Sequence, residues 1–267
     1  MAKARSSYWQ DRIAEQREKS YERLNVDTER ELARIYREQA EGLRDDALKA
    51  FAKMEADKAS DAPLAANDLY RSRRYRTLLD EVNARLKALG QEQIRVTEPA
   101  IVKAYEDMLG LVDENVPQRY RVAPSLLNAH AIDATQVVNQ VWCLDGKKFS
   151  DRVWADKQRL LPQIKRALSD ALVQGKSPWE IAKAMSDRLE VSRENAFRLV
   201  RTETAHAQVY AQTQRYKEYG FTEGRFLASA KSCPECRELD GNVYALDKLE
   251  SMLPVHPRCT CTYTLVG

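Results

Sequence analysis

The apolar residues along most of the chain recur at the three- and four-residue spacing that places them on one face of an α-helix. The first such stretch covers residues 8 to about 58 and carries one apolar stripe on an otherwise charged helix. The stripe contains Leu32, Ile35, Tyr36, Leu43, Ala47, Phe51 and Met54. A break is expected at Asn25–Asp27, with Thr28 and Glu31 forming a capping box that restarts the helix. Such a stripe predicts a packing partner, most often another helix of the same chain.

The same spacing predicts further helices in the middle of the chain. One covers residues 69–89 and is capped by Gly90, because glycine readily adopts the left-handed conformation at helix ends. Another follows Pro99 and ends near Leu111. Residues 113–124 are expected to be irregular, and a helix is expected over residues 126–141.

The clearest boundary signals lie between residues 145 and 220. A turn at Asp145-Gly146 precedes a helix from Trp154 to Val173, which Gly175 closes. Ser177-Pro178-Trp179-Glu180 combines an N-cap serine, a proline at the first helical position and a glutamate at the third, which predicts a helix start. A further helix is expected over residues 192–219.

Beyond Gly220 the spacing changes from helical to alternating. Residues 221–230, 243–245 and 261–266 have the pattern of short β-strands. The predicted fold class is therefore mainly α, with long helices followed by a small α+β C-terminal module that contains short strands and a Cys/His knuckle.

Two domains are predicted along the sequence. Residues 1–148 form a helical N-terminal interaction region, and residues 149–267 form the C-terminal module. Within that module, helices are expected over residues 149–220 and the knuckle over residues 221–267.

Composition limits the classes of function. The chain is 43% hydrophobic, so it can build a core, and 9 Gly and 9 Pro in 267 residues argue against an all-β fold. A net charge of +3 gives no concentrated basic field of the kind that nucleic-acid binders use. The sequence has no apolar run of about 18 residues, so we expect no membrane span. Its charged N-terminus indicates a protein made in the cytosol rather than exported.

Three other polar features are interpreted as structural. The basic run Arg71–Arg76, beside Tyr70 and Tyr75, is read as an exposed helix start, with DNA contact as the alternative. Glu203 and His206 share a helix face, as metal-binding pairs do, but the sequence has no second such pair. We therefore expect Arg201 and Glu203 to join a semi-buried polar network, with His206 packed nearby. Cys143 is expected to be a buried small hydrophobic residue.

Four of the five cysteines lie in the last 35 residues and carry the candidate chemistry. The two-residue gap between Cys233 and Cys236 lets a tight turn aim both sulfurs at one point, as tetrahedral zinc requires. His256 and Cys259 supply a second pair, and Cys261 is a fifth candidate for four places. Structural zinc contributes on the order of 10–16 kcal/mol in small modules, far more than the few apolar side chains of this tail.

Structural Zn²⁺ is therefore the predicted cofactor, and the Cys/His knuckle is predicted to be a zinc knuckle. The alternatives are a disulfide, for example between Cys233 and Cys259 or Cys261, and unliganded thiols. A catalytic metal is disfavoured, because it needs an open coordination position and a nearby base. His256 is required as a ligand, which leaves only Asp240 and Glu238 as candidate bases. We therefore predict no catalytic residues and no enzymatic activity.

Several motifs occur together near the end of the chain. They are Arg201-Thr202-Glu203, the pair Cys233 and Cys236, the turn Leu239-Asp240-Gly241, and the ending His256-Pro257-Arg258-Cys259-Thr260-Cys261. Together they resemble the MuF-type phage head morphogenesis proteins, also called minor head proteins, over residues 149–263. The opening Tyr8-Trp9 with Arg12 is similar to the N-terminal regions of that family. Phe226 stands where members often carry a tryptophan, and a packing role survives that exchange.

This resemblance implies a minor capsid protein that acts in procapsid assembly and head morphogenesis. The implied partners are the portal protein and inner capsid or scaffold proteins, with packaged DNA as a further candidate and no membrane. The implied location is the capsid interior of the virion, and the host cytoplasm before assembly. The family's metal ligands correspond to Cys233, Cys236, His256, Cys259 and Cys261. The rival readings are a DNA-binding ejection protein and a metal-dependent nuclease.

Overall fold

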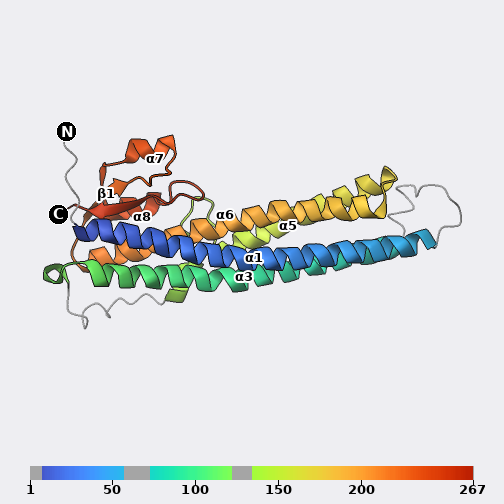
Figure 1. Cartoon of the computed structure of the whole chain (residues 1–267), viewed down its shortest axis with the longest axis horizontal. Helices are drawn as coiled ribbons and strands as arrows, with labels where there is room; N and C mark the ends of the chain where they lie inside the picture. Colours follow the sequence, from blue (N-terminus) through green and yellow to red (C-terminus); the bar gives the residue numbers. More distant parts are fainter. Residues whose placement is uncertain (1–7, 57–72, 122–133, 267) are drawn as a thin grey trace. The chain divides into compact units, whose positions relative to one another are not determined.

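The computed structural model of the chain describes residues 8–56, 73–121 and 134–266, and long helices dominate these residues (Figure 1). The long helices are α1 (Tyr8–Ala56), α3 (Arg73–Asn115), α5 (Phe149–Val173) and α6 (Pro178–Glu218). The short helices are the 3₁₀ turns η1 (Gln118–Tyr120) and η3 (Ala134–Asn139), with α7 (Pro234–Leu239) and α8 (Leu246–Met252). The strands are β1 (Glu223–Leu227), β2 (Val243–Ala245) and β3 (Thr262–Leu265). The predicted fold class is confirmed.

The chain forms two compact units, each assembled from separate stretches of sequence. Unit 1 takes residues 1–28, 97–149 and 198–267, and unit 2 takes residues 29–96 and 150–197. Both units therefore draw on both sides of the division that we predicted at residue 148. That division describes regions along the sequence, and it stays a prediction.

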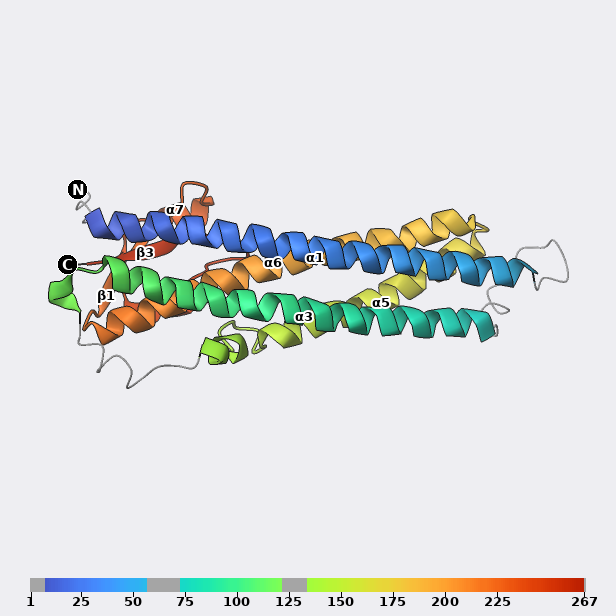
Figure 2. The same cartoon turned by 60° about the horizontal axis from the view of Figure 1, so that its bottom comes forward.

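Unit 2 is built from segments of the four long helices, which lie side by side (Figure 2). Each segment buries one apolar stripe, as its helical spacing predicts. The buried residues include Leu32, Ile35, Leu43, Ala47 and Phe51 of α1, Leu78, Val82, Leu86 and Leu89 of α3, Val153, Leu160, Ile164 and Leu168 of α5, and Ile181, Met185 and Leu189 of α6. The stripe on α1 is thus buried by helices of the same chain, as expected.

A buried polar network crosses the helical segments of unit 2. The Lys157 ammonium on α5 donates to the Tyr36 hydroxyl of α1, to Ser192 Oγ of α6 at 2.9 Å and to Asp156 Oδ2 at 3.1 Å. The Tyr36 hydroxyl in turn donates to Gln93 Oε1 of α3 at 3.0 Å. Burial lowers the pKa of Lys157, and the carboxylate of Asp156 opposes that shift. Because the partners come from four helices, the network fixes how these segments align.

The three strands of unit 1 form an antiparallel sheet in the order β2-β1-β3. Phe226 of β1 is paired with Tyr263 of β3, and both side chains are buried. The Tyr263 ring also meets the Tyr216 ring of α6 edge to face, with centroids 6.0 Å apart. The predicted strands are confirmed, and Phe226 has the packing role expected of it. The sequence pattern did not indicate helices α7 and α8. Helix α8 packs against β1 and β2 of this sheet (Figure 1).

The break predicted near residue 25 is wrong, because α1 continues through it. The polar side chains that suggested a cap are turned back onto the helix. Thr28 Oγ1 donates to the Leu24 carbonyl at 2.7 Å, and the Asn25 amide donates to the Tyr21 carbonyl at 2.8 Å. Asn25 also accepts a hydrogen bond of 3.1 Å from Thr204 of α6. Contacts with another helix therefore outweigh the local preference of asparagine for turns.

The prediction of separate helices on either side of Gly90 and Pro99 is also wrong. Helix α3 passes through both residues without interruption. A Cβ atom at Gly90 would lie 2.6 Å from a ring carbon of Trp154, so this glycine admits the indole against the helix backbone instead of capping it. Burial of Leu89 and Ile101 near these positions supports a continuous helix despite the missing N–H of Pro99. The start predicted at residue 69 lies outside the described residues.

The signals around α5 and at the start of α6 are confirmed. Gly175, after α5, has a φ of 66°, and Ser177 and Glu180 form the predicted capping box. The separate helix predicted from residue 192 is wrong, because α6 runs on from Pro178. Ser192 Oγ donates to Asp156 at 2.5 Å in the polar network and does not cap a helix.

The remaining expectations concern the loop before α5. Residues 134–139 form a 3₁₀ turn rather than the α-helix predicted over 126–141, and residues 126–133 lie outside the described part. The Asp145-Gly146 turn is present, with the Gly146 N–H bonded to the Cys143 carbonyl. Cys143 is half-buried rather than buried.

The described part of the basic run, Arg73–Arg76, starts α3 as expected, with Arg73 and Arg76 exposed. Residues 70–72 are outside the described ranges. Among the described helices, none has a stretch long and apolar enough to cross a membrane.

Candidate metal centre

Helix α7 brings Cys233 and Cys236 together. Cys233 is the N-cap residue of this helix, and its sulfur accepts the backbone N–H of Cys236 at 3.5 Å. Pro234 follows at the first helical position, where its fixed φ suits the start of a helix. The same hydrogen bond lowers the pKa of the Cys233 thiol. This is the tight turn that the two-residue gap predicted.

A second turn presents His256 and Cys259. The Cys259 N–H donates to the His256 carbonyl at 3.0 Å, and Arg258 between them has a φ of 63°. The Arg258 N–H donates to Thr202 Oγ1 of α6 at 3.1 Å, which ties this turn to the Arg201-Thr202-Glu203 motif. His256 Nδ1 lies 3.0 Å from the Pro257 carbonyl, so it carries the proton and leaves Nε2 available as a ligand atom.

The two turns face each other at distances that suit a tetrahedral metal. His256 Nε2 lies 3.3 Å from the Cys233 sulfur and 3.4 Å from the Cys236 sulfur. The Cys236 and Cys259 sulfurs are 3.9 Å apart. Zn–S bonds of about 2.3 Å at tetrahedral angles separate two sulfurs by about 3.8 Å. These three distances are therefore compatible with a tetrahedral zinc ion.

All five predicted ligands meet at this place, in two groups that share Cys236. One group is Cys233, Cys236 and His256, and the other is Cys236, Cys259 and Cys261, with ligand atoms within 4.8 Å of one another in each. Each group could hold a metal ion. Thiolate and imidazole ligands suit zinc and offer nothing to magnesium or calcium, which prefer oxygen. Which four of the five residues act as ligands stays a prediction.

Three residues of the cluster are buried, and the other two are partly exposed to solvent. Cys236, Cys259 and Cys261 are each at most 2% exposed, whereas Cys233 and His256 are half-buried. Burial raises the pKa of Cys236 to about 12, and a hydrogen bond from the Cys261 thiol lowers that of Cys259 to about 5. A divalent cation would replace the protons that the thiols now share.

Arg17 of α1 lies at the cluster and was missed in the sequence. It is 3% exposed, and its Nη1 donates to the carbonyl of Thr260 at 3.2 Å. The signal was available, because Arg17 falls at the four-residue spacing of Ile13 and Tyr21 on the buried face of the helix. A charged residue in such a position indicates a specific partner.

Glu203 and His206 do not belong to the cluster. The Trp142 indole N–H donates to Glu203 at 2.9 Å, and the His206 ring stacks on the Trp142 ring at 4.1 Å. His206 Nε2 also lies 3.3 Å from the Gln140 amide oxygen, and Arg201 forms an ion pair with Glu22. These contacts agree with the polar network that we expected.

Asp240, one of the two candidate bases, holds the turn after α7. Its Oδ1 accepts the Ala228 N–H at 3.0 Å, and the N–H of Gly241 donates to the Phe226 carbonyl at 2.9 Å. The Leu239-Asp240-Gly241 motif thus joins α7 to β1, and Asp240 has a structural role there.

The comparisons with known proteins agree with these motifs. The family described as Phage Mu protein F like protein matches residues 162–264, which include all five residues of the cluster. No curated protein and no solved structure matches the chain significantly. The family match covers less than half of the chain, and it contains residues 162–173 of α5, all of α6 and the sheet except for Leu265. Over residues 162–264, therefore, the resemblance to the MuF-type phage head morphogenesis proteins is confirmed.

Proposed function

We propose that this protein is a minor head component of a phage, which acts in procapsid assembly by docking on the portal from inside the head. The observation that carries the proposal is the match of residues 162–264 to the Phage Mu protein F like family. The protein acts as a binding component, without catalysis. Its helical segments supply long interaction faces, and its C-terminal end supplies a small rigid surface.

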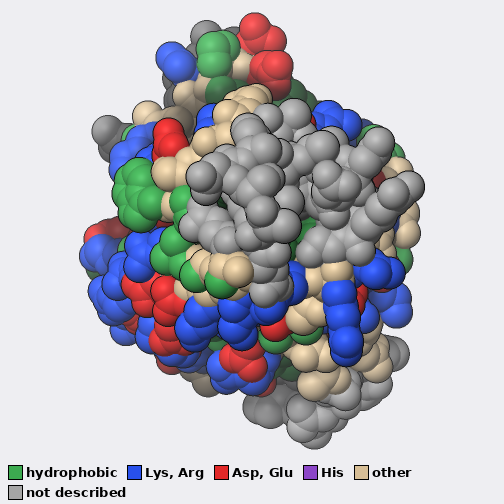
Figure 3. Space-filling view, turned by 90° about the vertical axis from the view of Figure 1, so that its right-hand side faces the viewer, with side chains coloured by type: hydrophobic (Ala, Val, Ile, Leu, Met, Phe, Trp, Pro, Cys, Tyr) green, Lys and Arg blue, Asp and Glu red, His purple; other side chains and the backbone are tan. Residues whose placement is uncertain are grey.

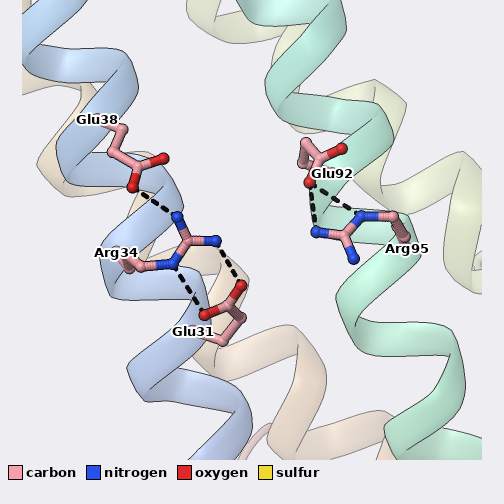
Figure 4. Close-up of polar contacts among 5 residues, drawn as sticks. All are labelled: Glu31, Arg34, Glu38, Glu92 and Arg95. Carbon is pink, nitrogen blue, oxygen red and sulfur yellow. Dashed lines mark hydrogen bonds and ion pairs between the residues drawn. The ribbon is translucent and has the colours of Figure 1, made fainter.

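The exposed charges of unit 2 favour a protein partner over DNA. Arg34 on α1 is paired with Glu31 at 2.6 Å and with Glu38 at 2.5 Å, and Arg95 on α3 is paired with Glu92 at 2.6 Å (Figure 4). Each arginine here is neutralised within its own helix. DNA binding gains its affinity from cations that replace counterions on phosphates, and paired arginines contribute little to that exchange.

The basic start of α3 also lies among acidic residues. It borders a cavity of about 610 Å³ between the end of α1 and the start of α3, and Figure 3 shows Lys and Arg beside Asp and Glu on the described part of this face. The charged residues around the cavity are Lys49, Lys53, Arg73, Arg74, Asp46 and Glu81. Such mixed charge suits complementary protein contacts, and it makes a DNA-binding ejection protein the weaker reading.

The cofactor we propose is structural Zn²⁺, held by four of the residues Cys233, Cys236, His256, Cys259 and Cys261. The tetrahedral spacing of the sulfur and nitrogen atoms supports it. Elemental analysis of protein purified under reducing conditions should give close to one zinc per chain. Absence of zinc, or a disulfide found within the cluster, would remove the cofactor without touching the assembly role.

Co-expression with the portal protein of the same phage tests the function. We expect the two proteins to co-purify, and we expect this protein in assembling heads and in purified virions. If heads assemble normally after deletion of the gene, and the protein is never found in particles, the proposal is wrong. A salt-dependent shift of DNA in gels would instead favour the ejection protein. DNA cleavage with a divalent metal that is lost in His256→Ala would establish a nuclease.

A further inference from the structure

The buried guanidinium of Arg17 lacks the partners that such a group requires. Its Nη1 donates to the Thr260 carbonyl, but its Nε and Nη2 are buried without a hydrogen-bond partner among the described residues. An arginine is a permanent cation with five N–H donors, so burial with one neutral acceptor is strongly unfavourable. Something of opposite charge must lie close to it when the protein is stable.

Within the cluster, the groups that can carry this charge next to Arg17 are thiols, and the exposed Glu18 carboxylate on α1 adds a further attraction. Thr260 stands between Cys259 and Cys261 in the sequence, and both sulfurs interact electrostatically with the guanidinium. When a metal binds, the thiols lose their remaining protons, and a divalent cation with three thiolates and one imidazole has a net negative charge next to the guanidinium.

We propose that Arg17 balances the charge of a metal–thiolate centre, so that the seating of the first turns of α1 on the C-terminal strand depends on the bound metal. This inference rests on the zinc site of the proposed function. The metal would then stabilise the knuckle and also hold the first turns of α1, residues 8–24, against the C-terminal strand.

Two neutral contacts flank Arg17 on the same helix. The Gln10 amide donates to the Leu265 carbonyl of β3 at 2.9 Å, and the Tyr21 hydroxyl donates to the Arg201 carbonyl of α6 at 3.0 Å. Figure 1 shows this first part of α1 beside the sheet. Neither contact changes with the charge of the cluster. Arg17 is therefore the contact through which loss of the metal would loosen residues 8–24.

Hydrogen exchange on the wild-type protein tests the coupling without any substitution. The zinc-loaded, reduced protein is compared with the same protein after chelation. We expect faster exchange at residues 233–261, where the ligands lie, and also at residues 8–24. Faster exchange at the ligands alone, with residues 8–24 unchanged, would overturn the inference while leaving the zinc site intact. If the wild-type protein binds no zinc, the zinc site and this role of Arg17 are both overturned.

Arg17→Met tests whether the charge of Arg17 contributes to zinc binding. The substitution keeps an apolar stem and removes the charge, and we expect zinc affinity to fall by about tenfold, the lower end of the effect of residues that support metal ligands. Exchange at residues 8–24 should then respond less to chelation. Arg12→Met is the matched control, because Arg12 is exposed on the same helix. Equal zinc affinity in Arg17→Met and Arg12→Met would contradict the proposal.

Discussion

Unit 2 and the knuckle at residues 221–266 are stabilised by different means. Unit 2 buries long apolar stripes from four helical segments, and its one buried ammonium, Lys157, has hydrogen-bond partners on every side among the described residues. The knuckle has three short strands and two short helices, and sulfur and imidazole groups occupy its centre. Unit 2 therefore combines a large apolar core with a buried polar network, whereas we propose that the knuckle depends on a bound metal.

The largest expected effect comes from removing the cysteine that both halves of the cluster share. Cys236→Ser should abolish tight zinc binding and with it apparent binding energy on the order of 10 kcal/mol. Limited proteolysis should then cut within residues 221–266 and leave unit 2 intact. Cys143→Ser is the control, because Cys143 lies outside both groups. Retention of zinc and of protease resistance in Cys236→Ser would mean that the two regions are held alike.

A second test breaks unit 2 at its polar network. Lys157→Met fills the same space but leaves Asp156 and Ser192 without their cationic partner, and removal of one member of a buried pair costs roughly 3–5 kcal/mol. Denaturant unfolding should show the loss as a lower midpoint. Lys165→Met, at an exposed position of the same helix, should leave the midpoint unchanged. Equal midpoints for the two variants would show that apolar packing alone determines the stability of unit 2.

A third test adds a single methyl group to the packed interface of α3. Gly90→Ala places a Cβ atom 2.6 Å from the Trp154 ring, and overpacking of this kind costs about 1–3 kcal/mol. A Cβ atom at Gly110 on the same helix would meet no other described side chain or neighbouring element within 4 Å, so Gly110→Ala should be neutral or raise stability by up to about 1 kcal/mol. Thermal unfolding of both variants should give shifts in opposite directions, or a shift for Gly90→Ala only. A similar Tm for both variants would argue against the close contact.

The smallest effect is expected at the charged surface. Arg34→Ala removes both ion pairs with Glu31 and Glu38 (Figure 4), but these side chains are well exposed and solvent screens such pairs. We expect no resolvable change in Tm. A clear decrease in Tm would show that surface ion pairs contribute to the stability of unit 2, so that charged groups stabilise both regions.

Periodicity predicted the helices well and their ends less well. The apolar stripes and the capping box at Ser177 follow from spacing within a few residues, which a sequence displays directly. Asn25 and Gly90 look like helix ends for the same local reason. Their actual roles depend on Thr204 and Trp154, which lie far away in the sequence. Local preference loses wherever such a distant contact decides the conformation.

At the candidate site, too, local spacing was predictive and contacts between distant parts of the sequence were not. The meeting of its five candidate residues was predicted, because their spacing in two short motifs is itself the signal for a shared metal. Arg17 was not predicted, because it reaches the cluster from a helix at the other end of the sequence. Thr202 was recognised as part of a motif, but its hydrogen bond with the Arg258 N–H was not predicted. Residues that support a ligand need not lie near it in the sequence.

The bond between Gln10 and Leu265 joins residues 255 positions apart, and this separation has a consequence for biosynthesis. Unit 2 is complete once residue 197 has been made, so its helices can pack while the ribosome is still translating. Unit 1 must wait for its last strand, and until then the first turns of α1 keep an apolar face with no sheet to cover it. Newly made chains are therefore most exposed to aggregation in the interval before β3 emerges.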